Sequence, residues 1–356
     1  MPGVPATAED VDARWLEAAL AARHPGVRVA GVELVEAHEA TNAHARLRVA
    51  YEADAGCPAT LFCKLLPTRE PTRAAIAATG MGLREALFYE RLAHRLALRT
   101  PAVHAALCDE ATGAFALLLE DLRATGCTIS TGPEGVAPDA AARALEELAQ
   151  MHARYASAER RRAEAGFVRA PDPPSDYGVT RLRYGLDHHR ERLAPAFAEL
   201  AELYVARRDA VHAAWEDGPR TVVHGDTHVG NLFDDAGRTG FLDWGIVHVG
   251  TPLREVSYFL TMAMAVDDRR AHERDLWRVW LDAFAANGGE PIAFDDAWRA
   301  HRLHAAYTVP ASCQVVTFPD DASPARRVFA DAFLARAEAA VEDLEARAAL
   351  RDLKGV

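Results

Sequence analysis

The sequence predicts an α+β protein with a small, strand-rich N-terminal lobe followed by a larger helical lobe. Four strand-like stretches come early in the chain, at 27–36, 44–52, 59–66 and 114–122. Helical patterns dominate the remainder, at 138–157, 188–216, 254–266, 270–287, 294–309 and 324–350. A glycine-containing stretch at 125–136 separates the two parts, as is typical of a loop. We therefore expect an N-terminal lobe over 1–122 and a helical lobe over 123–356.

The elements of the N-terminal lobe follow from local patterns. Residues 8–23 are amphipathic, with acidic residues early and arginine late, which favours a helix. The stretch 59–66 is apolar and ends at Pro67, as strands often do. Apolar residues spaced along 81–98 form a helical stripe. The stretch AFALLLEDL at 114–122 is typical of a buried strand that ends in an acidic turn.

Composition limits the partners and the compartment. A net charge of −12 argues against nucleic acid, which is bound by clustered positive charge. The longest apolar run, 256–266, is too short to span a bilayer, and the start of the chain shows no leader pattern. Five scattered cysteines without a CxxC pair argue against disulfides or zinc. We expect a cytoplasmic monomer or homodimer that binds neither nucleic acid nor membrane.

Lysine is almost absent from the sequence. Of the 40 basic residues, only Lys64 and Lys354 are lysine, and the other 38 are arginine. Arginine is a planar fork, whereas lysine is a compact point charge on a slim stem. A position that keeps lysine in this background is predicted to need that shape, which makes Lys64 a candidate site residue.

The densest polar motif is TVVHGDTHVGNLFDDAGRTGFLDWG at 221–245, bracketed by short strand-like stretches. It contains H-x-D-x₄-N at His224, Asp226 and Asn231, followed by an apolar strand and Asp243. Phosphoryl transfer needs a carboxylate to orient the acceptor hydroxyl and take its proton, and oxygen ligands for Mg²⁺. Asp226 suits the first role, and Asn231 and Asp243 suit the second. The spacing matches the catalytic loop and metal-binding aspartate of protein kinases.

Simpler interpretations exist for several of these residues. Asp234 and Asp235 fit a solvated turn. His224 and His228 could ligate a transition metal, although such a site wants a third histidine or cysteine and only His248 is near in sequence. We favour a structural role for His224, as a packed and hydrogen-bonded residue that holds the loop.

The same chemistry needs a cation for the α- and β-phosphates, and Lys64 in the strand FCKLL meets this need. A helix glutamate usually holds that lysine. Glu85 in LREALFYERL is well placed, because the nearby Leu87 and Phe88 would turn the helix toward the strands. Glu90 is the rival candidate.

Taken together, these motifs resemble the aminoglycoside phosphotransferase / choline kinase superfamily, with the best likeness to ecdysteroid-kinase-like bacterial phosphotransferases. The resemblance covers about residues 30–310 and rests on HGDTHVGN with LDWG, EALFYERL, LLLEDL at 117–122 and LAQMHARYA at 148–156. The first motif is the most specific. The resemblance implies a bilobal protein-kinase-like fold with ATP, or GTP, between the lobes.

The resemblance also implies residue roles. Asp226 would be the catalytic base in a loop at 224–231, Asn231 and Asp243 would bind Mg²⁺, and Lys64 would pair with Glu85. An interlobe hinge at about 119–122 would meet the adenine through backbone groups of Glu120 and Leu122.

Two positions depart from the family pattern. The nucleotide-covering hairpin has no glycine in EAHEATNAHAR (36–46), so we assign the nucleotide contact at its tip to Thr41 and Asn42. After the metal aspartate, PLRE replaces the usual P-x-x-D, so Glu255 would brace the catalytic loop in place of an aspartate. Neither departure removes a catalytic group.

The sequence therefore predicts an ATP- and Mg²⁺-dependent kinase that phosphorylates a hydroxyl of a small molecule, such as an antibiotic or metabolite. The alternative is a nucleotide-binding pseudokinase or scaffold. Such a protein would have no use for the full set of polar site residues, namely Lys64, Asp226, Asn231 and Asp243. A protein kinase is disfavoured because no A-P-E motif follows Asp243. Acidic pairs such as Asp320–Asp321 would suit a cationic aminoglycoside or choline-like acceptor, whereas aromatic residues such as Phe318 would suit a less charged alcohol.

Overall fold

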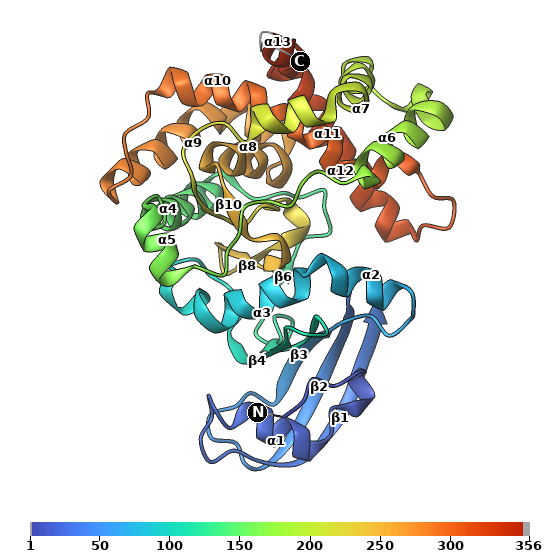
Figure 1. Cartoon of the computed structure of the whole chain (residues 1–356), viewed down its shortest axis with the longest axis vertical. Helices are drawn as coiled ribbons and strands as arrows, with labels where there is room; N and C mark the ends of the chain where they lie inside the picture. The colour runs from blue at the N-terminus through green and yellow to red at the C-terminus, as the bar shows by residue number, and fades with distance from the viewer. Residues whose placement is uncertain (1, 352–356) are drawn as a thin grey trace. The chain divides into compact units, whose positions relative to one another are not determined.

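The computed structural model describes residues 2–351, so Lys354 lies outside the described part. The chain divides into two compact units (Figure 1). Unit 1 contains the residues up to Thr128 together with Gly240–Val247, and unit 2 contains Ile129–Thr239 and the residues from His248 onward. The boundary expected near residue 122 lies a few residues before this division. Asp243, which we grouped with the helical lobe, packs with unit 1.

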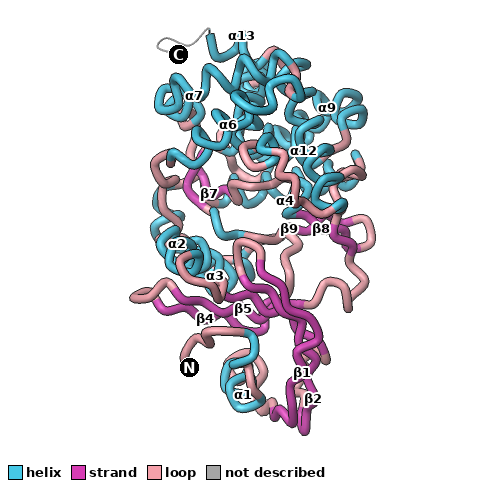
Figure 2. Tube along the Cα trace, turned by 90° about the vertical axis from the view of Figure 1, so that its right-hand side faces the viewer, coloured by secondary structure: helices cyan, strands magenta, loops and turns pink. Residues whose placement is uncertain are grey.

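Unit 1 is built on a five-stranded antiparallel sheet with the order β1-β2-β3-β5-β4. Its strands, magenta in Figure 2, and its helices are β1 (Arg28–Glu39), β2 (Ala43–Ala53), β3 (Thr60–Leu65), β4 (Val103–Asp109), β5 (Ala114–Glu120), α1 (Ala13–Leu20), α2 (Thr72–Thr79) and α3 (Met81–Arg91). The predicted strands correspond to β1, β2, β3 and β5, whereas β4 and α2 were not predicted. The helix expected over 81–98 ends at Arg91, because Leu92 leaves the helical conformation.

The two faces of this sheet have different neighbours. Leu47 on β2 and Leu61 on β3 belong to a buried cluster with Leu16 and Leu20 of α1, which lies along the sheet in Figure 1. Successive side chains of a strand point to opposite faces. Cys63 belongs to the same α1-side cluster, so the next residue of β3 points to the face that α3 covers.

Unit 2 is mainly helical. Its elements are α4 (Pro138–Arg154), α5 (Ala158–Glu164), α6 (Asp176–His189), α7 (Pro195–Trp215), β7 (Thr221–Val223), β8 (Leu232–Asp235), β10 (His248–Gly250), α8 (Pro252–Ala263), α9 (Val266–Ala286), α10 (Phe294–His304), α11 (Thr308–Ala311), α12 (Pro324–Asp343) and α13 (Ala346–Arg351). Strand β7 pairs with β10, and β8 lies between β6 (Thr128–Ile129) and β9 (Arg238–Phe241) in a small second sheet. The predicted α+β class, with a small antiparallel-sheet part and a helical part, is confirmed.

Helix α8 forms the centre of unit 2, since each of its residues is buried. Its buried residues include polar ones, among them Arg254, Glu255 and Ser257. Buried polar groups are stable only when they are hydrogen-bonded, so α8 is expected to make specific polar contacts inside the unit. Those contacts reach the polar loop that follows β7.

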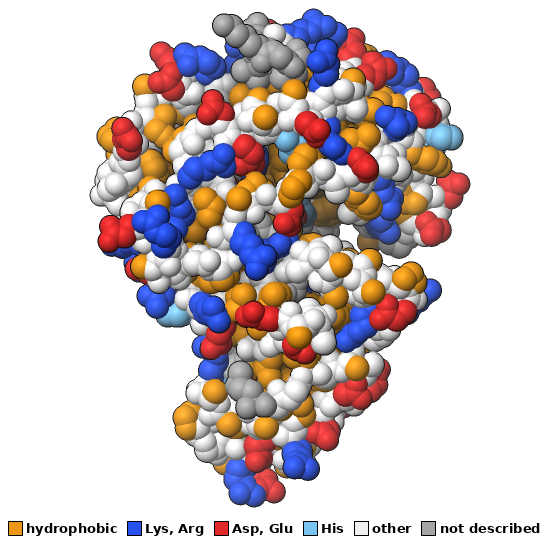
Figure 3. Space-filling model, in the orientation of Figure 1, with side chains coloured by type: hydrophobic (Ala, Val, Ile, Leu, Met, Phe, Trp, Pro, Cys, Tyr) orange, Lys and Arg blue, Asp and Glu red, His pale blue; other side chains and the backbone are white. Residues whose placement is uncertain are grey.

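The surface carries both signs of charge. On the face shown in Figure 3, basic and acidic side chains are interspersed with uncharged surface, and since Lys64 is buried, the basic ones are arginines. Within the described residues, no helix is long and apolar enough to cross a bilayer.

Candidate active site

Three of the predicted site residues meet in unit 1. Lys64 lies on β3, on the face of the sheet that α3 covers, and its side chain is only 6% exposed. Its Nζ is 2.7 Å from Glu85 Oε2 on α3 and 3.0 Å from Asp243 Oδ1. Glu85 is likewise buried, whereas the side chain of Asp243 is 40% exposed. The rival Glu90 instead pairs with Arg23 on the exposed surface, 2.6 Å away.

Close packing of α3 on the sheet places Glu85 over Lys64. Gly82, one turn before Glu85, lies against Phe115 of β5, and a Cβ at this position would come within 2.0 Å of the Phe115 ring. On the other side, Phe88 stacks on Trp244 with ring centroids 3.8 Å apart. Glycine at residue 82 therefore permits the helix–sheet distance that the Lys64–Glu85 pair requires.

Asp243 lies at a sharp backbone turn. Its φ of +62° and ψ of +64° are left-handed, a conformation that non-glycine residues adopt rarely and mostly at special sites. Arg84 of α3 donates a hydrogen bond of 2.9 Å to the carbonyl of Gly245, two residues later. The turn is thus tied to the helix that carries Glu85, and it directs the Asp243 carboxylate toward Lys64.

The electrostatics of this cluster keep the lysine charged. Burial alone would lower the pKa of Lys64, but the carboxylates of Glu85 and Asp243 outweigh it and raise that pKa above its usual value. Burial, with the nearby Asp243 carboxylate adding to it, raises the pKa of Glu85 to about 7 against the opposing effect of Lys64. A fully charged, buried ammonium with one partly exposed carboxylate beside it is suited to binding an anion together with a metal cation.

The residues predicted to contact the nucleotide differ in their surroundings. Thr41 is exposed in the turn between β1 and β2. Asn42 is only 5% exposed, and among the described residues its Oδ1 has no hydrogen-bond partner. An unpaired buried amide oxygen is costly, and of the two predicted residues only Thr41 is exposed to solvent.

The predicted hinge residues lie at the end of β5. The Glu120 side chain forms an ion pair with Arg99, at 2.8 Å, and the backbone N–H of Glu120 donates to the carbonyl of Ala102. The carbonyl of Leu122 accepts a hydrogen bond from Cys127 N–H at 2.9 Å. These contacts hold the backbone of the segment in place, and the contact with adenine stays a prediction.

Asp226 and Asn231 are brought together in unit 2, in the loop that follows β7. Asn231 Nδ2 donates to the Asp226 carbonyl at 2.9 Å and to Asp226 Oδ2 at 3.0 Å. Since the amide nitrogen of Asn231 is committed in this way, its Oδ1 is the atom that suits a cation. Tyr258 of α8 donates a hydrogen bond of 3.3 Å to the other carboxylate oxygen, Asp226 Oδ1. The base candidate is therefore held at both oxygens while its side chain remains 34% exposed.

A buried brace from α8 and α4 supports this loop. Glu255 Oε1 accepts a hydrogen bond of 2.7 Å from the Gly225 N–H, and its Oε2 lies 2.8 Å from His152 Nε2. Trp280 Nε1 donates to His152 Nδ1 at 3.1 Å, so the proton of His152 lies on Nε2 and points to Glu255. Burial would raise the pKa of Glu255, but the hydrogen bonds from His152 and Gly225 lower it overall. The expected contact between Glu255 and the loop is present.

The histidines of the loop have structural contacts. His224 is completely buried, and its Nδ1 accepts a hydrogen bond from the Asp226 N–H at 3.2 Å. His228 Nδ1 accepts from the Gly230 N–H at 3.0 Å. The described residues contain no group of three or more histidine, cysteine or acidic side chains arranged to hold a metal ion. The burial of His224 and its hydrogen bond within the loop favour the packed role.

Two site residues escaped prediction from the sequence. Tyr258 looks like one more apolar residue in a buried helix, and nothing local indicates that its hydroxyl reaches Asp226. Burial and the Asp226 carboxylate raise the pKa of Tyr258 well above its usual value, so it remains a hydrogen-bond donor. His152 gave a clearer signal, because it is a histidine on the apolar stripe of a helix, where a polar partner is required.

Solved structures that resemble the chain are kinases and phosphotransferases. The choline kinase of Cryptosporidium parvum is 7% identical, covers 89% of this chain and 91% of its own, and has a TM-score of 0.53. The macrolide 2'-phosphotransferase MphH of Brachybacterium faecium is 20% identical over 88% of this chain and 96% of its own, at a TM-score of 0.46. A choline/ethanolamine kinase family protein of Mesorhizobium loti is 18% identical, covers 94% of this chain and 96% of its own, and also has a TM-score of 0.46. The first of these likenesses shows a kinase-like fold.

The family match defines the class of small-molecule kinases. The model of the phosphotransferase enzyme family matches residues 59–304, more than half of the sequence, and the chain belongs to this family. No curated protein matches the sequence. The predicted superfamily and the predicted enzyme class, a small-molecule phosphotransferase, are confirmed, whereas the closer likeness to ecdysteroid-kinase-like members stays a prediction.

Proposed function

We propose that the chain transfers the γ-phosphoryl group of Mg²⁺-bound ATP, or GTP, to a hydroxyl of a small molecule, with Asp226 as the general base. The observation that carries this proposal is the buried Lys64, which is paired with Glu85 and Asp243 at 2.7 and 3.0 Å. Burying the charges of Lys64 and Glu85 is costly unless the geometry is good and each charge is paired. A purely structural role would be served as well by apolar residues.

The base is suited to its task by its surroundings. Asn231 and Tyr258 each donate a hydrogen bond to Asp226, which orients its two carboxylate oxygens. A carboxylate held in this way positions the acceptor hydroxyl and takes its proton as the phosphoryl group is transferred. The exposed third of the Asp226 side chain is the part that an acceptor can reach.

The donor set fits magnesium. Mg²⁺ prefers oxygen ligands and is usually held by one or two carboxylates together with substrate phosphates, not by an all-protein cage. Asp243 supplies a partly exposed carboxylate, and Asn231 supplies an amide oxygen. When bound, the ion would neutralise charge on the phosphates. Lys64 would hold the α- and β-phosphates, and Glu85 would keep the ammonium in place.

A screen tests the proposal. The full chain is incubated with ATP or GTP, Mg²⁺ and a panel of hydroxylated antibiotics and metabolites, and mass spectrometry detects acceptors that gain one phosphate. We expect transfer to at least one acceptor, a higher Mg²⁺ requirement for Asn231→Ala, and no transfer by Asp243→Ala. Full activity in excess EDTA, or nucleotide binding with no transfer to any acceptor, would argue for the scaffold alternative.

A further inference from the structure

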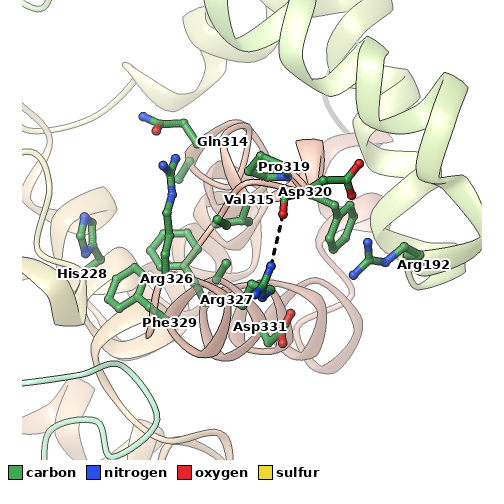
Figure 4. A pocket seen from close by; sticks show the side chains of 15 residues that line it. Arg192, His228, Gln314, Val315, Pro319, Asp320, Arg326, Arg327, Phe329 and Asp331 are labelled. Carbon is green, nitrogen blue, oxygen red and sulfur yellow. Dashed lines mark hydrogen bonds between the residues drawn. The ribbon is translucent and has the colours of Figure 1, made fainter. Parts of the chain in front are cut away.

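A cavity in unit 2 lies beside the catalytic loop. Its volume is about 350 Å³, within the range of small-molecule sites. Helix α12 and the segment before it form most of its wall, and His228 of the catalytic loop completes it (Figure 4). Phe318, Phe329 and Phe333 give the wall an aromatic surface. The cavity is therefore a concave, partly aromatic pocket whose lining residues all belong to unit 2.

His228 connects this cavity with the base. Its Nδ1 accepts the Gly230 N–H, so the proton of the neutral ring lies on Nε2, which is 3.5 Å from Asp226 Oδ2. The other side of the same ring meets Phe333 and Phe329 edge-on, with centroids 5.3 and 6.3 Å away. A molecule resting on these phenylalanines would thus reach a residue that contacts Asp226.

The charged residues of the wall favour a negative ligand. Three arginines and two aspartates line the cavity: Arg192, Arg326, Arg327, Asp320 and Asp331. Arg192 lies over the Phe318 ring at 3.6 Å, and Arg327 donates to the Asp320 carbonyl at 3.4 Å. Among the described residues, the guanidinium of Arg326 has neither an ion pair nor a hydrogen-bond partner. In Figure 4 its side chain rises from α12 on the side of His228, while Arg192 and Asp320 lie at the other end.

The acidic pairs that would suit a cationic acceptor are placed differently. Asp267 and Asp268 lie in the first turn of α9, and Asp295 and Asp296 lie in the first turn of α10. Acidic residues at these positions stabilise the helix dipole, and none of the four lines the cavity. Of the third pair, Asp320 lines the cavity, at the end away from His228.

Building on the proposed function, we propose that this cavity is the acceptor site and that it takes an alcohol with an aromatic or otherwise apolar body and a carboxylate group. The apolar body would pack on Phe329 and Phe333, and the carboxylate would pair with Arg326, whose planar guanidinium suits a carboxylate. The hydroxyl would then lie on the His228 side, toward Asp226. A polycationic acceptor would bring its charges against an unpaired guanidinium.

A charge series of one scaffold tests this assignment. The compounds are 6-(hydroxymethyl)-2-naphthoic acid, its carboxamide, and (6-(aminomethyl)naphthalen-2-yl)methanol, in which an aminomethyl group replaces the carboxylate. Calorimetry measures their binding to the full chain without nucleotide. We expect the carboxylate to bind about tenfold more tightly than the carboxamide, and the amine to bind most weakly. Equal binding of all three, tightest binding of the amine, or no binding of any at millimolar concentration would overturn the inference.

Variants link the preference to the residue. Arg326→Gln is expected to remove the difference between carboxylate and carboxamide, and Arg327→Gln, one position along the same helix, is expected to keep it. Phe329→Ala should weaken the carboxylate and the carboxamide alike. A charge preference that survives Arg326→Gln would contradict the role of this residue.

Adding ATP and Mg²⁺ separates the two proposals. Because the binding experiment needs no nucleotide, a carboxylate preference without phosphate transfer to any acceptor would contradict the proposed function while supporting the cavity's preference. Phosphate transfer to the amine as readily as to the carboxylate would support the proposed function and overturn the inference about charge.

Discussion

The N–H of Gly225 donates a 2.7 Å hydrogen bond to the buried carboxylate of Glu255. Glu255 thereby links the residue just before Asp226 to the centre of unit 2, and His152 holds its other oxygen. In Glu255→Gln, an amide nitrogen would face one of these two donors and leave it unsatisfied. We expect ~1–3 kcal/mol of lost stability and a fall in turnover of ~10²-fold, because a small displacement of the base is costly.

Glu273→Gln is the matched control for the Glu255 substitution. Glu273 is another buried glutamate of unit 2, which pairs with Arg269 and His301 and not with the loop that carries Asp226. Its loss should lower the melting temperature without changing the turnover of the folded enzyme. If Glu255→Gln also lowered only the melting temperature, the bracing role would be wrong.

Gly82→Ala is expected to disturb the cluster of Lys64, Glu85 and Asp243 without touching a charged residue. The new Cβ would collide with Phe115 and push α3 away from the sheet, which separates Glu85 from Lys64. Nucleotide affinity, measured by calorimetry, should fall about tenfold or more. Gly178→Ala is the control, because a Cβ at this position of helix α6 would lie 3.9 Å from the Tyr204 hydroxyl, an ordinary contact. It should leave nucleotide affinity unchanged and favour the helix slightly. Wild-type affinity in Gly82→Ala would show that α3 can move freely.

Lys64→Arg is expected to be nearly as damaging as Lys64→Met, although it keeps the positive charge. The ammonium fits between two carboxylates at 2.7 and 3.0 Å, and the broader guanidinium would displace Glu85 or the phosphates. A shift of ~1 Å can lower the rate ~10²-fold. Steady-state kinetics with thermal melts would measure the effect, and Lys354→Arg at the other lysine serves as the control. Retention of more than about half of wild-type kcat/KM, a loss below ~0.5 kcal/mol, would contradict the assignment.

His304 is expected to make folding sensitive to acid. Burial, with Arg254 and His301 adding to it, lowers the pKa of His304 to about 3. A histidine in the unfolded chain has a pKa near ~6.5. The contribution of neutral His304 to the stability of the fold is therefore complete above that pH, and it is lost as the pH falls toward 3. At pH 5 the loss would be ~2 kcal/mol.

Denaturant unfolding of His304→Leu between pH 7 and 5 measures this effect. Leucine fills about the same volume without a titratable ring, so the stability of the variant should depend less on pH than that of the wild type. His272→Gln, at an exposed position of α9, should keep the full dependence. An unchanged slope in His304→Leu would assign the acid sensitivity to other groups.

Local sequence patterns located the polar loop and the lysine, because both stand out from their neighbours. Asp226 follows an apolar strand, and Lys64 is a lysine in an arginine-rich chain. The contact between Tyr258 and Asp226 had no such signal, since it arises only when α8 packs against the loop. Gly82 was unremarkable for the same reason, because its closeness to Phe115 is a property of helix–sheet packing.

Several elements were also hidden from local patterns. Strand β4 contains two alanines and a histidine, a composition with weak strand preference, and it is defined by pairing with β5. Helix α6 has only two buried residues, Leu182 and Gly185, so it has no clear apolar stripe. The helix expected over 188–216 begins at Pro195, because proline is favoured in the first turn.

Turnover of Asp226→Asn tests the assignment of the base most directly. The substitution keeps the size of the side chain but removes the proton acceptor, so we expect turnover on an identified acceptor to fall by about 10²–10⁴-fold. ATP affinity and the melting temperature should change little, because Lys64 and its partners lie on other elements. Near-normal turnover in Asp226→Asn would contradict the account.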